Sequence, residues 1–248
     1  IQVYVENGAL EHGFLGFYQM QEENFQPNKH IFSALLKACG KMKSVDQGRE
    51  IYAQIVEQGL ESELFIGSGL VDMYVKCESL VEAQDVLYHM SKRNVVTWTS
   101  IIVGYTQQEQ CYEAFDSFTR MQAESLAPNM ITLVSILKAC GNIVQIHKGK
   151  QMHVHGGLLM KKENESGMFG SALIAMYAKC GVLVKAQDVF NEILVHDVVS
   201  WTALIVGYVQ HDHIYGALDC FERMQCESVA PNEVAFACIL KACSSTRA

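Results

Sequence analysis

The feature that most constrains this chain is an internal repeat, because a chain that repeats itself must fold as a series of similar substructures. Segment 95–105 has the sequence VVTWTSIIVGY, and it returns at 198–208 as VVSWTALIVGY. The tetrapeptide Leu-Lys-Ala-Cys occurs three times, ending at Cys39, Cys140 and Cys243. The three prolines of the chain follow one another at spacings of 101 and 103 residues. The sequence therefore predicts a repeat architecture with a long period of about 100 residues.

Each long period divides into three shorter repeats of unequal length. Complete repeats are expected at 29–63, 64–94, 95–129, 130–166, 167–197 and 198–232, with partial repeats at 1–28 and 233–248. The repeat at 130–166 carries two residues more than its copy at 29–63. Because the chain starts and stops inside a repeat and does not begin with Met, we expect it to be a fragment of a longer array.

Each short repeat has the pattern of two amphipathic helices. In 95–129 the apolar residues recur at the i, i+3, i+4 and i+7 spacing of a helix face, a polar break follows at 107–110, and a second stripe ends before Pro128. The residues of the two stripes are Trp98, Ile101, Ile102, Tyr105, Ala114, Phe115, Phe118 and Met121. A hairpin of 35 residues cannot bury both stripes alone, but stacked neighbours can. We therefore predict an all-α fold, a right-handed α-solenoid of helix-turn-helix repeats.

Composition restricts the possible functions. The formal net charge is −8, which counts against nucleic-acid binding unless the 19 basic residues gather on one face. No apolar stretch is long enough for a membrane span. The nine cysteines predict reduced, buried thiols. Since the cysteines at 39, 140 and 243 and those at 77 and 180 recur once per long period, we expect them to lie far apart and to form no metal site.

These motifs together resemble the pentatricopeptide repeat over the whole chain. The alternation of 35, 35 and 31 residues is similar to the plant-type mixed subclass, whose repeats are named P, L and S. The Trp-Leu-Gly-Tyr pattern of the tetratricopeptide repeat is absent. In this scheme the P repeats are 1–28 (partial), 95–129 and 198–232, the L repeats are 29–63, 130–166 and 233–248 (partial), and the S repeats are 64–94 and 167–197.

The resemblance implies that the chain binds single-stranded RNA and selects about one base per repeat. In this family the fifth and the last residue of a repeat together choose the base. The implied base-reading pairs are Ser68 with Asn94, Thr99 with Asn129, Ser171 with Asp197, and Thr202 with Asn232. A hydroxyl with Asn implies adenine and a hydroxyl with Asp implies guanine, because a carboxylate only accepts hydrogen bonds whereas an amide also donates them.

The L repeats depart from this pattern. Ser33 with Glu63 and Val134 with Ser166 are weak readers, so the expected RNA core is 5′-AANGA-3′. The second residue of a repeat is implied to clamp the base against its neighbour. The expected clamp residues are Phe65, Val96, Ile131, Met168 and Val199.

All these positions also have an ordinary structural interpretation. A hydroxyl near a helix start often caps free N–H groups, an Asn after Pro is a common turn residue, and an apolar residue at a helix entry packs between repeats. The recurrence of the hydroxyl and amide or carboxylate pairs in register over four repeats favours base reading instead.

No catalytic motif, metal ligand set or cofactor site is expected. The resemblance implies an RNA-processing factor of mitochondria or chloroplasts that recognises sites of cytidine-to-uridine editing, with other RNA-editing or processing proteins as further partners and no membrane. The alternative is a helical protein–protein interaction scaffold, which the acidic charge favours. Lysines and arginines on the face of the base-reading residues would favour RNA.

Overall fold

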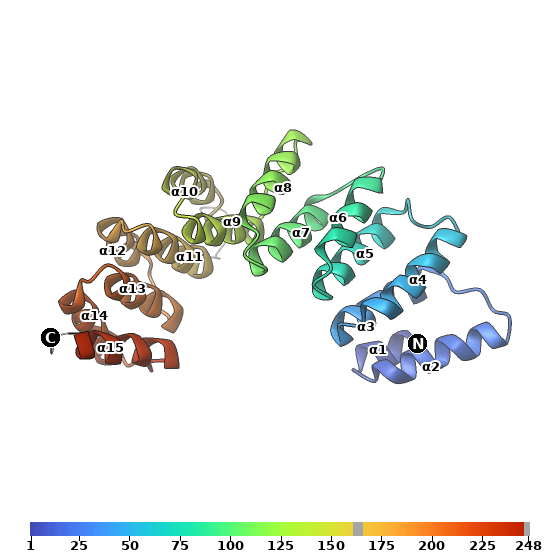
Figure 1. Ribbon diagram of the computed structural model, residues 1–248, viewed down its shortest axis with the longest axis horizontal. Helices are drawn as coiled ribbons and strands as arrows, with labels where there is room; N and C mark the ends of the chain where they lie inside the picture. The colour runs from blue at the N-terminus through green and yellow to red at the C-terminus, as the bar shows by residue number, and fades with distance from the viewer. Residues whose placement is uncertain (161–165, 246–248) are drawn as a thin grey trace. The chain divides into compact units, whose positions relative to one another are not determined.

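The computed structural model describes residues 1–160 and 166–245, with side chains described for 1–157 and 167–244. The chain divides into two compact units, Ile1–Pro128 and Asn129–Ala248, called here the N-terminal and C-terminal units. All regular elements in the described residues are α-helices (Figure 1), so the expected all-α class is confirmed. None of these helices is both long and apolar enough to cross a bilayer.

In the described residues the helices α1 to α14 come in pairs, and α15 is the first helix of the partial repeat at the end of the chain. The N-terminal unit contains α1 (Gln2–Glu6), α2 (Leu10–Glu22), α3 (Lys29–Met42), α4 (Val45–Glu57), α5 (Leu64–Lys76), α6 (Leu80–His89), α7 (Val95–Gln107) and α8 (Cys111–Ala123). The C-terminal unit contains α9 (Met130–Asn142), α10 (Ile146–Met160), α11 (Ser166–Lys179), α12 (Leu183–Glu192), α13 (Val198–Gln210), α14 (Ile214–Cys226) and α15 (Glu233–Ser245). Helix α11 begins one residue before the expected start at 167.

The helices of each unit form two layers. The first helices of successive repeats pack side by side, α1, α3, α5 and α7 in the N-terminal unit and α9, α11, α13 and α15 in the C-terminal unit. Within each unit, a second helix contacts the first helix of its own repeat and that of the next repeat, as α6 does with α5 and α7. Within the described part of each unit, second helices do not contact one another. The first helices therefore form the continuous layer, and they carry the candidate residues.

The two apolar stripes of the repeat form the core as expected. Trp98, Ile101, Ile102 and Tyr105 of α7 are buried, and so are the four residues of the α8 stripe. The break between the stripes is a tight turn in which Glu109 has a left-handed backbone (φ 60°) and the amide of Gln110 donates to the carbonyl of Tyr105 at 2.9 Å. This bond closes the end of the first helix and directs the chain into the second.

The glycine of the recurring Val-Gly-Tyr motif permits close helix packing. A Cβ atom at Gly207 would lie 2.4 Å from the Cβ of Ala178 on α11, and one at Gly104 would lie 2.8 Å from a methyl of Leu80. Glycine is required at both positions because any side chain would push the neighbouring repeat away.

The recurring cysteines are closer to one another than expected. Cys77 Sγ lies 3.8 Å from the carbonyl oxygen of Cys39, and Cys180 Sγ lies 4.0 Å from that of Cys140. The expectation that they lie far apart is wrong for these two pairs, because α3 packs on α5 and α9 packs on α11. Burial raises the pKa of Cys39 to about 12, which keeps this thiol protonated. Cys243, in the third copy of the motif, is exposed.

Candidate functional site

The expected clamp residues share one position, the second residue of a first helix, and all of them face solvent. Their exposed fractions lie between 54% and 63% in a chain where most large apolar side chains are buried. Packing between repeats is therefore the wrong interpretation for Phe65, Val96, Ile131, Met168 and Val199. Val81, Tyr112, Val184 and Tyr215, each the second residue of a second helix, are exposed as well. The exposure of the clamp residues leaves one apolar side chain per repeat available for contact along the first helices.

Two further residues occupy the clamp position and were missed in the sequence. Val234 on α15 is 52% exposed, and His30 on α3 is also exposed. Val234 belongs to the partial repeat at the end of the chain, and His30 to an L repeat that carries no interpretable pair. The signal that finds both is their position, one residue after the start of α15 and one after the start of α3.

The hydroxyl residues lie about one helical turn after the clamp residues, and three of them, Ser68, Ser171 and Thr202, bind the backbone of their own helix and do not cap it. Ser68 donates to the Leu64 carbonyl at 2.6 Å, and Ser171 and Thr202 donate in the same way to the carbonyls four residues earlier, at 3.0 and 2.6 Å. The capping interpretation is therefore wrong for these three. A hydroxyl that donates to the backbone keeps its oxygen lone pairs available as acceptors.

The last residue of each P and S repeat is the actual helix cap. It accepts a hydrogen bond from the backbone N–H three residues further on, at the start of the next first helix. The pairs are Asn94 with Thr97 (2.9 Å), Asn129 with Thr132 (2.8 Å), Asp197 with Ser200 (2.7 Å) and Asn232 with Ala235 (2.9 Å). Asn129 and Asn232, which the alternative interpretation treats as ordinary turn residues, therefore cap the next helix.

Packing of the first helices brings two of the expected pairs together in the C-terminal unit. Ser171 Oγ lies 3.4 Å from Asp197 Oδ1, and Thr202 Oγ1 lies 3.3 Å from Asn232 Oδ1. In the N-terminal unit Ser68 is on α5 and Asn94 caps α7, two helices that pack on each other. Thr99, which is buried, lies in the N-terminal unit and Asn129 in the C-terminal unit.

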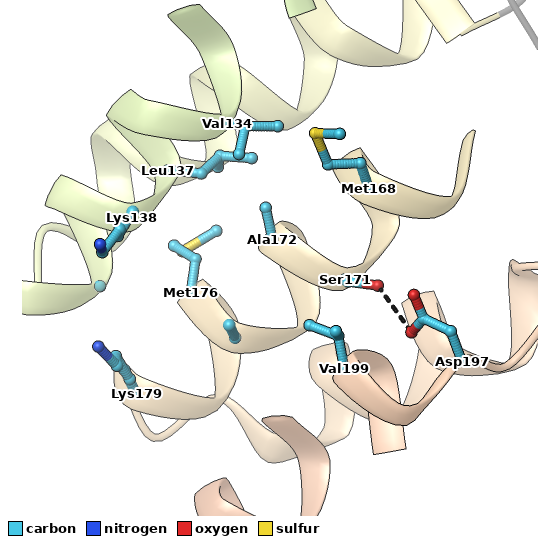
Figure 2. Close-up of a pocket in the computed structure, with 12 residues that line it drawn as sticks. Val134, Leu137, Lys138, Met168, Ser171, Ala172, Met176, Lys179, Asp197 and Val199 are labelled. Carbon is cyan, nitrogen blue, oxygen red and sulfur yellow. Dashed lines mark hydrogen bonds between the residues drawn. The ribbon is translucent and has the colours of Figure 1, made fainter. Parts of the chain in front are cut away.

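A groove between α9, α11 and α13 collects several expected residues (Figure 2), and its volume is about 560 Å³. The clamp residues Met168 and Val199 line it, together with the pair Ser171 and Asp197 and the weak reader Val134. Figure 2 shows the Ser171 hydroxyl directed at the Asp197 carboxylate beside Val199. An apolar groove with a few convergent polar groups has the character of a ligand site.

Two lysines add positive charge to this groove, and the sequence did not single them out. Lys138 of α9 and Lys179 of α11 line its wall opposite Asp197 (Figure 2). Lys179 donates to the side chain of Asn142 at 2.7 Å, which holds its ammonium group beside α9. Asp197 is the one carboxylate among the lining residues.

A smaller groove of about 100 Å³ in the N-terminal unit, which Glu6 of α1 also lines, contains the same kinds of side chain. Ser33, His30 and Lys37 of α3 line it together with Phe65 of α5. Lys37 stands at the same position of its repeat as Lys138 does in α9. The arrangement of clamp, hydroxyl and lysine is therefore present in both units.

The weak readers differ structurally from the other pairs. Glu63 stands at the cap position of α5, but its side chain makes no capping hydrogen bond and lies 3.6 Å from Lys29 Nζ instead. The side chain of Ser166 lies outside the described residues. No cluster of three or more potential metal ligands is found in the described residues.

Comparison with known proteins gives a consistent family. A model of the PPR repeat family matches residues 93–142 and 196–245. A model of the single PPR repeat matches residues 30–60 and 171–198. A mitochondrial pentatricopeptide repeat-containing protein of Arabidopsis thaliana is 36% identical over 98% of this chain, and a chloroplastic one is 36% identical over 93%. The chain spans only 35% and 37% of those two proteins.

Solved structures show the same fold. The crystal structure of the pentatricopeptide repeat protein PPR10 in complex with an 18-nucleotide psaJ RNA element superposes with a TM-score of 0.77 at 17% identity, covering 97% of this chain and 36% of that one. The crystal structure of PPR10 from maize gives a TM-score of 0.73 at 18% identity, covering 99% and 36% of the two chains. These similarities confirm the α-solenoid class.

Proposed function

Because the chain belongs to the pentatricopeptide-repeat family, we propose that it binds single-stranded RNA along its first helices and selects about one base per repeat. The observation that carries this proposal is the row of exposed clamp residues at one helix position. An apolar side chain on each side of a base replaces the stacking that the base loses when the strand is single. The solved relative PPR10 binds RNA, which supports the same role here.

The distribution of charge favours RNA over the scaffold alternative. The net charge of −8 lies in residues 1–128, because residues 129–248 carry equal numbers of acidic and basic side chains. In this neutral C-terminal part, the groove that holds the pair Ser171 and Asp197 also holds Lys138 and Lys179. Ammonium groups beside a base-sized groove can neutralise the phosphates of a bound strand. A peptide-binding scaffold would not require lysines at equivalent positions of two repeats.

The base assignments belong to this proposal. Three pairs select adenine, namely Ser68 with Asn94, Thr99 with Asn129, and Thr202 with Asn232. The pair Ser171 with Asp197 selects guanine. Together the P, L and S repeats read a 5′-AANGA-3′ core. Names of relatives that place them in mitochondria and chloroplasts support an organellar RNA-processing role. We propose recognition of cytidine-to-uridine editing sites, together with other RNA-editing or processing proteins, as the specific form of that role.

Replacing one carboxylate oxygen of Asp197 by an amide group tests how the base is read. Asp197→Asn keeps an oxygen that can cap α13 but replaces the second carboxylate oxygen by an amide donor. Fluorescence anisotropy at fixed salt should show that the parent protein prefers AANGA over AANAA and that the variant reverses this preference. A hydrogen bond to a charged group contributes about 1.5–3 kcal/mol, so the change in preference should be roughly tenfold or more.

Asp212→Asn is the matched control. It removes the same charge from an exposed turn residue with φ 60°, a conformation that Asn also accepts, and it lies outside the groove. Its base preference should equal that of the parent. If neither RNA binds at low salt, or if both variants change binding equally, base reading through Asp197 is wrong and the scaffold alternative is favoured.

A further inference from the structure

The last residue of a P or S repeat caps the next helix, and under the proposed function the same short side chain also faces the bound base. The cap uses a particular atom. Asn94 Oδ1 accepts from the backbone N–H of Thr97 at 2.9 Å and from the hydroxyl of Thr97 at 2.7 Å. Both donors come from the third residue of the following repeat.

Capping decides what the side chain can offer to a ligand. An unconstrained Asn offers both an acceptor and two donors, and it would therefore suit adenine and guanine alike. Once Oδ1 is engaged by two donors, the Nδ2 amide is what remains, and in the described residues nothing accepts a hydrogen bond from Asn94 Nδ2. An amide donor matches the ring-nitrogen acceptors of adenine and opposes the N1–H of guanine.

Capping has the opposite consequence for Asp197. Its Oδ1 accepts from the Ser200 N–H at 2.7 Å and lies 3.4 Å from the Ser171 hydroxyl. The remaining oxygen, Oδ2, is an acceptor, which matches the N–H groups of guanine. Helix capping therefore converts Asn into a donor and leaves Asp an acceptor.

We propose that Thr97, which no part of the base-reading scheme includes, is a positioning residue that locks the Asn94 amide in its donor-outward orientation. The inference rests on the proposed function and deepens it. Thr97 is fully buried, so it acts through Asn94 and does not touch RNA. Thr132 makes the same bond to Asn129, with its hydroxyl 2.9 Å from Oδ1.

The other two readers lack this lock. The Ser200 hydroxyl donates to the main-chain oxygen of Asp197 at 2.8 Å, so it leaves the carboxylate alone, and Ala235 beside Asn232 has no hydroxyl. A carboxylate needs no lock because its two oxygens are chemically equivalent. Ser200 is therefore the natural control for Thr97.

The test uses Thr97→Val, which keeps the shape but removes the hydroxyl, and Thr97→Ser, which restores it. Binding of the 248-residue chain to AANGA and GANGA gives the adenine preference at the base assigned to Asn94. The parent and Thr97→Ser should show the same preference, and Thr97→Val should reduce it about two- to tenfold, the range that one hydrogen bond provides. Ser200→Ala should leave the guanine preference unchanged.

A measurement without RNA separates the two proposals. The side-chain ¹⁵N heteronuclear NOE of Asn94 should be high in the parent and in Thr97→Ser and lower in Thr97→Val, with circular dichroism confirming that each variant is folded. If the parent shows no adenine preference while the NOE falls in Thr97→Val, the RNA proposal fails and the lock stands. An unchanged NOE and an unchanged preference in Thr97→Val would refute the lock.

Discussion

At the scale of single residues, the polar atoms of this chain are constrained by the backbone before any ligand arrives. The hydroxyls of Ser68, Ser171 and Thr202 are bound to carbonyls of their own helix, and the Asn and Asp readers are bound to the next one. What each can offer to RNA is the atom that the fold leaves over. Under the proposed function, a residue can therefore have an ordinary structural role and also select a base.

His153 gives a residue-scale prediction about pH. Its Nδ1 lies 3.0 Å from the Tyr177 hydroxyl, and burial lowers the pKa of His153 below its ordinary value of 6.5. As pH falls through about 6.5 the unfolded chain therefore binds this proton before the folded chain does, and stability decreases toward acid. We expect the free energy of unfolding, measured by urea titration at pH 7.5, 6.5 and 5.5, to fall more steeply in the parent than in His153→Gln. Equal slopes would contradict the prediction.

At the scale of elements, the cap residues of the first helices are also the residues that we propose to select bases. Asn94, Asn129, Asp197 and Asn232 cap their helices through the side chain, whereas Glu63 at the start of α5 does not. Helix α5, which follows the L repeat 29–63, thus lacks a side-chain cap, and Glu63 lies 3.6 Å from Lys29 Nζ instead. Under the proposed function, the missing cap also makes Ser33 with Glu63 a weak reading pair.

Glu63→Asn should improve both the capping of α5 and, under the proposed function, base selection at this position. The backbone of Glu63 is extended (φ −70°, ψ 123°), as a cap requires, so an Asn there should cap α5 and raise the free energy of unfolding by up to about 1 kcal/mol. Under the proposed function it should also add an adenine preference at the base preceding AANGA, measured by anisotropy with AAANGA against GAANGA. Glu63→Gln loses the charge and the contact with Lys29 but cannot cap well. If Glu63→Asn and Glu63→Gln have the same stability and the same base preference, capping by residue 63 does not cause the change.

At the scale of the whole molecule, this acidic protein carries basic residues in the groove that we propose to bind RNA. Lys138 and Lys179 face one groove although the net charge is −8. RNA affinity should therefore fall with salt, with a slope of log K against log salt of about −0.7 per phosphate neutralised. Lys138→Ala combined with Lys179→Ala should reduce this slope by about 1.4. Lys185→Ala, which removes an exposed lysine paired with Asp188 on α12, is the control and should leave the slope unchanged.

The sequence by itself determined the helices, their pairing into repeats and the core. Helix periodicity and proline stops are local properties, so Trp98 and Phe118 could be assigned to buried stripes without a structure. The family resemblance likewise located the candidate clamp and reading positions, and all five clamp residues proved to be exposed.

Only the tertiary structure decided which of these side chains meet and which atoms they present. Three features depend on the register between the first helices of neighbouring repeats. They are the position of Lys138 and Lys179 in one groove, the contact between Ser171 and Asp197, and the closeness of Cys39 to Cys77. That register is set by packing across residues about 30 to 40 positions apart, including the close approach at Gly207, and no local pattern encodes it. The repeats therefore follow from local sequence, and the recognition surface follows from how the repeats stack.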